Sequence, residues 1–187
     1  GKLAERHAKL REGWAATLER VKNDSPMHLA WVSHCLSQVK DDDTVVIRES
    51  SMMQQFFDVS QPATCFNAGA ASGLGWGMGV ALGAKLATPD KLVIGTEGDG
   101  AYMFSNPISA HSVAAENDLP ILTVIFNNGI WNAVRRSTVG LTPDGYAARS
   151  NRPPATMLDG ITNYEKVMEM VDGYGEKVTD PDDLIPA

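Results

Sequence analysis

Residues 91–100, KLVIGTEGDG, decide the fold, because a short apolar stretch runs directly into a turn made of Gly98, Asp99 and Gly100. Two other stretches, Thr44–Ile47 and Ile121–Phe126, are equally short, β-branched and continuously apolar. Strands that are apolar on both faces are typical of a parallel sheet buried between helices. We therefore expect an α/β fold: a doubly wound, mostly parallel sheet with helices on both faces.

Periodicity and capping residues predict the helices that accompany these strands. They are expected at residues 2–22, 26–40, 73–87, 107–116 and 163–171. Ser25-Pro26 supplies a cap and a first residue for the second of them. In the third, small residues recur at four-residue steps. They form a stripe without large side chains, which another backbone could approach closely. Residues 137–160 have little periodicity and are expected to form a long loop.

The composition describes an acidic, globular chain. Its 187 residues are 43 % hydrophobic, enough for the core of one domain. Sixteen Lys and Arg against 23 Asp and Glu give a net charge of −7, which disfavours binding to nucleic acid or anionic lipid. The longest uncharged run, residues 68–84, is too short and glycine-rich for a membrane span. Two cysteines form no disulfide framework, so we expect a cytoplasmic protein.

Both ends suggest a fragment of a longer polypeptide. The chain begins with Gly1, and residues 180–184 resemble the first turn of a helix that has no body. We expect a linker and helix over residues 1–24 and one domain over residues 25–187.

Polar clusters follow each of the three predicted strands. They are Arg48–Ser51, Glu97–Gly100 and Asn127–Gly129. In a parallel sheet these three ends share one edge, where ligands of open α/β sheets bind. The Asp99 carboxylate, asparagine amide oxygens and a backbone carbonyl form a hard-oxygen set that suits Mg²⁺ with ligand phosphates. A divalent cation would allow an acidic protein to hold a diphosphate.

The spacing of these motifs resembles a known family. Gly98-Asp99-Gly100, followed after the next predicted strand by Asn127-Asn128, is similar to the thiamine-diphosphate signature of the 2-oxoacid decarboxylase, acetolactate synthase and benzoylformate decarboxylase superfamily. The glycine-rich residues 70–78 and Leu119-Pro120 extend the resemblance over roughly residues 25–135. It covers only the C-terminal, diphosphate-binding domain, which in that family follows a pyrimidine-binding and a middle domain.

The resemblance implies a cofactor, thiamine diphosphate, and a metal, Mg²⁺. The implied metal ligands are Asp99, Asn128 and the carbonyl of Ile130. The implied cofactor-binding residues are Ser51, Ser72, Gly73, Leu74, Gly98, Gly100, Ala101 and Ile130. Among these, Leu74 would lie under the thiazolium and impose the folded shape of the cofactor.

The implied function is decarboxylation or ligation of 2-oxoacids. The activating glutamate of the family lies on the pyrimidine-binding domain, usually of a neighbouring subunit. We therefore expect no catalytic residue in this chain, no activity of the chain alone, and a homo-oligomer. Ala101 replaces the family's frequent Ser or Thr, and Val134 replaces the glutamate of the pyruvate decarboxylase type. The particular 2-oxoacid, and whether FAD is bound elsewhere, stay open.

Two other functions compete with this interpretation. A dehydrogenase-type Rossmann domain needs glycines at spacings of two and three, whereas residues 73–79 have only two-residue steps. A non-catalytic, degenerate cofactor domain is disfavoured because Asp99 and Asn128 are both present. Glu49 and Glu97 are interpreted as strand-end residues, solvated or bound to neighbouring amides, and Trp131 as either packing or pocket wall.

Overall fold

A four-stranded parallel sheet forms the centre of the molecule in the computed structural model, which describes residues 1–49, 52–69 and 73–187. The strands are β1 (Val45–Arg48), β2 (Cys65–Asn67), β3 (Val93–Gly98) and β4 (Leu122–Phe126). Their order is β2-β1-β3-β4, and the three pairings are all parallel. The expected α/β fold is therefore confirmed, with β1, β3 and β4 at the three apolar stretches.

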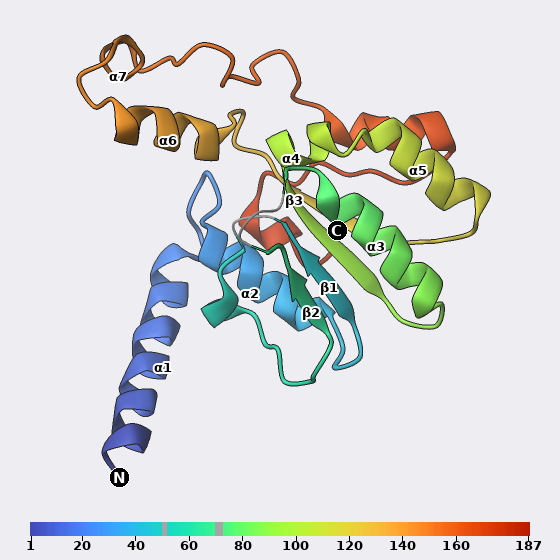
Figure 1. Ribbon diagram of the computed structural model, residues 1–187. Coiled ribbons are helices and arrows are strands. Elements are labelled where there is room, and N and C mark those ends of the chain that lie inside the picture. The colour runs from blue at the N-terminus through green and yellow to red at the C-terminus, as the bar shows by residue number, and fades with distance from the viewer. Residues whose placement is uncertain (50–51, 70–72) are drawn as a thin grey trace.

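Helices cover both faces of this sheet, α2 (Leu29–Val39) on one and α3 (Trp76–Ala87) on the other (Figure 1). The core on the α2 face includes Val32, Leu36, Val46 and Ile94. The core on the α3 face includes Val45, Ile47, Ala81 and Val93. Successive residues of β1 thus point into opposite cores, which explains why the strand is apolar without alternation.

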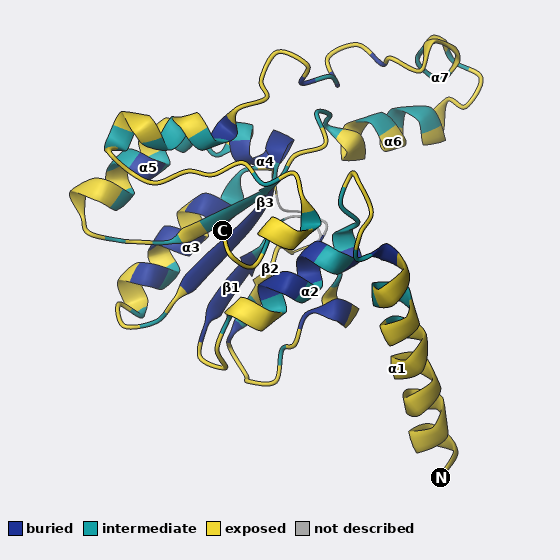
Figure 2. Cartoon of the chain, turned by 180° about the vertical axis from the view of Figure 1, so that it is seen from behind, coloured by how far each residue is buried: buried dark blue, intermediate teal, exposed yellow. Residues whose placement is uncertain are grey.

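The remaining helices differ greatly in how far they are buried. They are α1 (Lys2–Val21), α4 (Asp99–Phe104), α5 (Pro107–Glu116), α6 (Asn132–Leu141), α7 (Tyr146–Ser150), and the 3-10 helices η1 (Gln54–Phe56), η2 (Tyr164–Val171) and η3 (Pro181–Asp183). Helix α5 packs between α3 and η2. Helix α1 projects from the body, and most of its surface is exposed (Figure 2).

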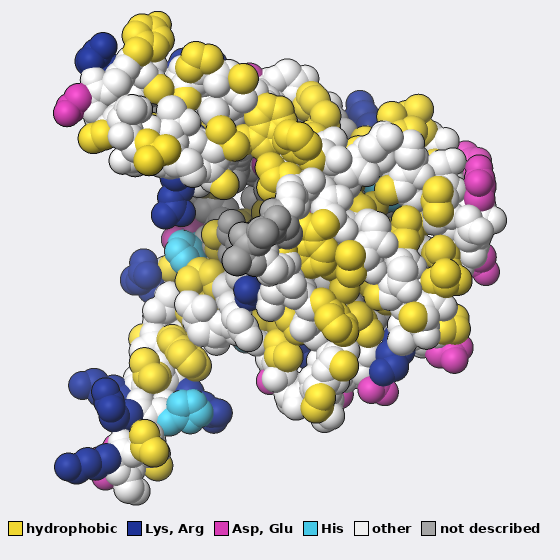
Figure 3. All heavy atoms as spheres, viewed as in Figure 1, with side chains coloured by type: hydrophobic (Ala, Val, Ile, Leu, Met, Phe, Trp, Pro, Cys, Tyr) yellow, Lys and Arg dark blue, Asp and Glu magenta, His cyan; other side chains and the backbone are white. Residues whose placement is uncertain are grey.

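The projecting α1 also carries an excess of positive charge in an acidic chain. Its sequence holds five Lys and Arg against three Glu, and Figure 3 shows these basic side chains gathered on it. Within the described residues, no helix combines the length and the apolar character that crossing a membrane requires.

Two of the expected helix boundaries are wrong. The second helix begins at Leu29, not at Pro26, because the ring Nδ1 of His28 accepts a hydrogen bond from the amide of Ala30 at 3.1 Å and caps the helix there. The third helix begins at Trp76, after Gly75 with its φ of +88°.

The expected long loop over residues 137–160 is also wrong in part. Helix α6 extends to Leu141, and the short α7 follows it. Neither helix contains a buried residue among those described, and the Ser, Thr, Gly, Pro and Asn residues of this stretch are typical of loops. The three-residue edge strand β2 was missed as well, because it is too short to show a pattern.

The bare stripe in α3 is approached closely by backbone at one end only. A Cβ on Gly75 would lie 2.5 Å from the carbonyl carbon of Phe104, so glycine is required there by space as well as by φ. Gly79 and Gly83 face open space among the described residues.

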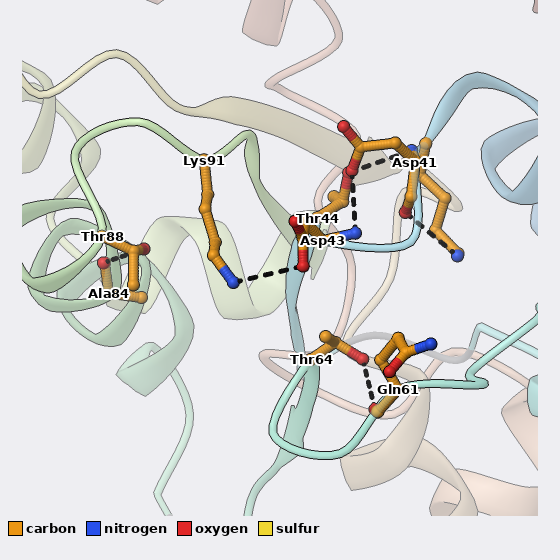
Figure 4. A network of polar contacts seen from close by, with 9 residues as sticks. Asp41, Asp43, Thr44, Gln61, Thr64, Ala84, Thr88 and Lys91 are labelled. Carbon is orange, nitrogen blue, oxygen red and sulfur yellow. Dashed lines mark hydrogen bonds and ion pairs between the residues drawn. The ribbon is translucent and has the colours of Figure 1, made fainter.

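Polar side chains close the turns at the amino ends of the strands (Figure 4). Before β1, the Thr44 hydroxyl donates to Asp41 Oδ1 at 2.7 Å. Before β2, the Thr64 hydroxyl donates to the Gln61 carbonyl at 2.7 Å. Lys91, before β3, forms an ion pair with Asp43 at 3.5 Å. These contacts lie at the amino edge of the sheet, opposite the carboxyl edge where the strand-end clusters lie.

Candidate functional site

The ends of β3 and β4 bring the two signature turns together. Gly98, the last residue of β3, pairs with Phe126, the last residue of β4. Asp99 follows directly, is 2 % exposed, and accepts a hydrogen bond from the Gly129 amide through Oδ2 at 2.6 Å. Its Oδ1 accepts from the Gly100 amide at 2.9 Å. One buried carboxylate therefore ties the Gly-Asp-Gly turn to the Asn-Asn-Gly turn.

The Asn-Asn-Gly turn is shaped by its own side chains. Asn127 Oδ1 accepts from the Gly129 amide at 3.1 Å, and Asn128 Oδ1 accepts from the Ile130 amide at 3.0 Å. Gly129 has a φ of +69°, a conformation that favours glycine. Both asparagines are exposed, and an amide oxygen keeps a second acceptor position after one hydrogen bond. The turn therefore presents neutral oxygens beside Asp99.

A segment distant in the sequence binds the Asn-Asn-Gly turn through backbone hydrogen bonds. The Leu158 amide donates to the Gly129 carbonyl at 2.8 Å, and the Trp131 amide donates to the Thr156 carbonyl at 2.9 Å. Ile130 and Met157 form an antiparallel bridge between them. Thr156, Met157 and Leu158 belong to the stretch 137–160 that was expected to be a long loop. No sequence signal marks them as part of the site.

The first turn of α3 lies next to the same edge. Glu49, after β1, accepts from the Gly75 amide at 2.5 Å and from the Gly77 amide at 2.6 Å through its two carboxylate oxygens. This carboxylate fixes the turn that carries Leu74, whose side chain is 45 % exposed. The interpretation of Glu49 as a residue bound to neighbouring amides is confirmed.

Aromatic contacts connect the α3 turn to the Gly-Asp-Gly turn. Gly75 lies against the backbone of Phe104 at the end of α4. The Phe104 and Trp131 rings are 5.7 Å apart between centroids, and the Trp131 indole lies directly on Gly100. The two parts of the predicted cofactor site are thus connected through packed residues.

The interpretation of Glu97 as a solvated residue is wrong, because the residue is fully buried, while the Met78 amide lies beside its carboxyl group and lowers its pKa slightly. It is fully buried, and neither carboxyl oxygen forms a hydrogen bond of acceptable geometry with a described residue. A Cβ on Gly77 would overlap its carboxyl group and come within 2.9 Å of Glu49. Burial first, and the neighbouring Glu49 second, raise the pKa of Glu97 to about 8. Glu97 is therefore mostly neutral at pH 7.

A layer of aromatic residues closes the site behind Asp99. The Tyr102 hydroxyl and His111 Nε2 share a hydrogen bond of 2.8 Å, and burial lowers the pKa of that histidine. The Tyr164 ring meets the Tyr102 ring edge-on at 5.8 Å. Burial, followed by the negative charge of Asp99, raises the pKa of the Tyr164 hydroxyl, which has no hydrogen-bond partner among the described residues. These groups keep water away from one side of Asp99.

The structure gathers most of the predicted site residues at this edge. On the β3–β4 side they are Gly98, Asp99, Gly100, Ala101, Asn128 and Ile130. Gly73 and Leu74 lie in the turn before α3, both exposed. Ser51 and Ser72 lie outside the described residues, so their assignments stay predictions.

The side chains present fit a metal and a diphosphate. Asp99 is a buried carboxylate that forms no ion pair among the described residues, so a cation would find an uncompensated charge there. No group of three or more His, Cys, Asp or Glu in the described parts of the chain could hold a metal. A metal at Asp99 would therefore need neutral oxygens and ligand oxygens, as the mixed set predicts. Trp131 Nε1 and Tyr164 Oη, two donors with no hydrogen-bond partner in the described parts of the chain, would suit an anion.

An open parallel sheet that joins loops from separate strands at its carboxyl edge defines an α/β cofactor-binding domain. Residues 49–187 match the family described as "Thiamine pyrophosphate enzyme, C-terminal TPP binding domain", so the chain belongs to this family. The family match decides against the nucleotide-binding alternative.

Relatives of known function support the assignment. The chain is 31 % identical over 177 residues to a probable acetolactate synthase of Mycobacterium bovis, covering 90 % of this chain and 30 % of the relative. It is 32 % identical over 126 residues to a 2-hydroxyacyl-CoA lyase of Oryza sativa, covering 67 % and 21 %. The structure of the thiamine diphosphate-dependent 4-hydroxybenzoylformate decarboxylase of Rhodococcus jostii superimposes with a TM-score of 0.71 at 28 % identity, covering 88 % and 30 %. The chain thus spans under a third of these relatives.

Proposed function

We propose that this chain is the Mg²⁺- and thiamine diphosphate-binding part of an enzyme that decarboxylates or ligates 2-oxoacids. The observation that carries the proposal is the Asp99 carboxylate, buried and bonded to the Gly129 amide at 2.6 Å. Through this contact the two segments that the metal would need form one site. The names of the relatives, a synthase of acetolactate and a decarboxylase of 4-hydroxybenzoylformate, support the substrate class.

The chain's own residues divide into those that hold the metal and those that shape the site. Asp99 and Asn128, with the carbonyl of Ile130, would bind Mg²⁺, while Gly98, Gly100 and Ala101 would line the diphosphate. When bound, thiamine diphosphate supplies the electron sink for the carbanion that loss of CO₂ leaves. Leu74 would support the cofactor ring.

Glu49 orients the turn that carries Leu74, because both of its carboxylate oxygens are used by backbone amides. The aromatic layer of Tyr102 and Tyr164 excludes water behind the metal ligands. None of these groups is placed to transfer a proton to a substrate in our proposal. The proton-transferring glutamate would come from a pyrimidine-binding domain of the same or a neighbouring subunit, which makes a homo-oligomer the expected assembly.

Calorimetric titration of the 187-residue chain with thiamine diphosphate tests the metal assignment. We expect saturable binding with Mg²⁺ and loss of that binding when a chelator is added. Asp99→Asn keeps the shape but removes the charge, and should weaken Mg²⁺-dependent binding at least about tenfold. Asp90→Asn, in the exposed turn before β3, is the matched control.

Two results would count against the proposal. Equal affinity of the parent chain and Asp99→Asn would refute the metal assignment. Absence of Mg²⁺-dependent binding in the parent chain would favour the non-catalytic, degenerate module instead.

The proposed need for another domain has its own test. The 187-residue chain, supplied with Mg²⁺, thiamine diphosphate and either pyruvate or benzoylformate, should release no CO₂ above the cofactor-only background. Measurable turnover by this chain alone would show that it needs no other domain.

A further inference from the structure

The indole N–H of Trp131 is a buried donor with no acceptor. Nε1 is inaccessible to solvent and has no hydrogen-bond partner among the described residues. A buried donor left unpaired is unfavourable, so native proteins rarely keep one without a use. This N–H therefore calls for an acceptor that the described part of the chain does not supply.

The place of the indole indicates what that acceptor is. The ring lies on Gly100, so close that a Cβ there would overlap it. Asp99, the adjacent carboxylate, already accepts from the Gly100 and Gly129 amides, one through each oxygen. An anion bound against the Gly100 backbone would bring oxygens to the edge of the indole.

The backbone of Trp131 is fixed by hydrogen bonds, and its side chain packs on Gly100 and on one exposed ring. Its amide donates to the Thr156 carbonyl at 2.9 Å, and its carbonyl accepts from the Arg135 amide at 3.0 Å. The ring contacts Phe104, which is itself 60 % exposed, at a tilt of 57°. A small rotation of the indole against this exposed neighbour would turn Nε1 toward a ligand without moving the backbone.

We propose that the indole N–H of Trp131 donates a hydrogen bond to a phosphate oxygen of the bound diphosphate. The inference rests on the proposed function and assigns a role to a residue outside the implied cofactor-binding set. Position 101 is alanine and offers the phosphate no hydroxyl, so Trp131 supplies the side-chain donor from the other signature turn. The donor comes from the segment that also carries Asn128 and Ile130, so the metal and the diphosphate would be held by one turn.

Nuclear magnetic resonance of the ¹⁵N-labelled 187-residue chain tests this bond directly. The four tryptophans give four indole signals, and Trp131→Phe identifies the one in question. On addition of Mg²⁺ with inorganic diphosphate, and separately with thiamine diphosphate, we expect that signal to move downfield and its exchange with water to slow. The response to inorganic diphosphate shows that phosphate oxygens, and not the organic rings, are the acceptor.

Affinity gives a second, independent measurement. Trp131→Phe keeps an aromatic ring and removes the N–H, and a hydrogen bond to a charged acceptor predicts a Kd at least about tenfold higher. Trp14→Phe, the same exchange on the projecting α1, should leave the Kd unchanged. Adding Ala101→Ser to Trp131→Phe restores a donor beside the diphosphate and should recover part of the lost affinity.

The outcomes separate this inference from the function on which it rests. If the Gly100 and Gly129 amide signals respond saturably while the Trp131 indole signal stays in place, the inference is overturned and the proposed function stands. If none of these signals responds to millimolar diphosphate with Mg²⁺, both fail. Should Trp131→Phe not fold, replacing Trp14, Trp31 and Trp76 by Phe one at a time identifies the Trp131 signal of the parent chain by elimination, and that signal decides.

Discussion

Replacing Glu97 with glutamine should remove a large pH dependence from the stability of this fold. The Glu97 carboxyl is fully buried, and burial together with Glu49 raises its pKa from 4.5 to about 8. The unfolded chain releases this proton near pH 4.5, whereas the folded chain retains it up to about pH 8. The folded state binds more protons in that window, so the free energy of unfolding falls as the pH rises through it.

The size of the effect follows from the pKa shift. One pKa unit corresponds to about 1.4 kcal/mol, so keeping Glu97 protonated at pH 7 lowers the free energy of unfolding by about 3 kcal/mol. Between pH 5.5 and pH 7.5 the parent chain should lose roughly 2–3 kcal/mol through this group. Glutamine does not ionise, so Glu97→Gln should be the more stable protein at pH 7, with the difference shrinking toward pH 5.

Urea unfolding followed by circular dichroism from pH 5 to pH 8.5, with a chelator present, measures this difference. Glu116→Gln, at the exposed end of α5, is the matched control and should leave the slope with pH unchanged. Parallel stability curves for the parent and Glu97→Gln across this range would refute the reasoning. They would mean that Glu97 ionises in the fold at little cost.

Four further substitutions test the packing of the site by urea unfolding. Gly100→Ala should lower the free energy of unfolding by about 1–3 kcal/mol, because a Cβ overlaps the Trp131 indole; an unchanged value would contradict that packing. Gly75→Ala should lower the free energy of unfolding by at least about 1 kcal/mol, because φ is +88° and the new Cβ would lie 2.5 Å from the backbone of Phe104. Gly79 faces open space, so Gly79→Ala should instead raise the free energy of unfolding by up to about 1 kcal/mol. Glu49→Ala leaves the Gly75 and Gly77 amides without their acceptor and should lower the free energy of unfolding by about 1–3 kcal/mol. Hydrogen exchange of the Gly75 amide should become faster, and an unchanged exchange rate would show that the carboxylate is dispensable.

The parts of the fold that sequence reasoning predicted are those governed by local patterns. Continuous apolar runs indicated β1, β3 and β4, because a strand buried on both faces cannot alternate. The turn at Asp99 and the turn at Asn128 were expected at one edge because parallel strands end on the same side, and the bond from the Gly129 amide to Asp99 agrees with this.

The features of the fold that sequence reasoning missed depend on contacts between segments that are distant in the sequence. The clamp of Thr156 and Leu158 on the Asn-Asn-Gly turn consists of backbone hydrogen bonds, which any residue except proline can donate. Helix α6 was partly taken for loop because none of its described residues is buried and because Ser137, Thr138 and Gly140 are residue types typical of loops.

By itself, the amino-acid sequence determined the class of the fold and the sheet edge at which the candidate site lies. These follow from residue type and spacing along each strand and the turn after it. Only the tertiary structure decided the environments of the acidic and aromatic side chains. Glu49 and Glu97 look alike in the sequence, yet one is bound by two amides and the other is buried with a pKa of about 8. The physical reason is that hydration and hydrogen bonding depend on every atom packed around a group, and those atoms come from segments far away in the chain.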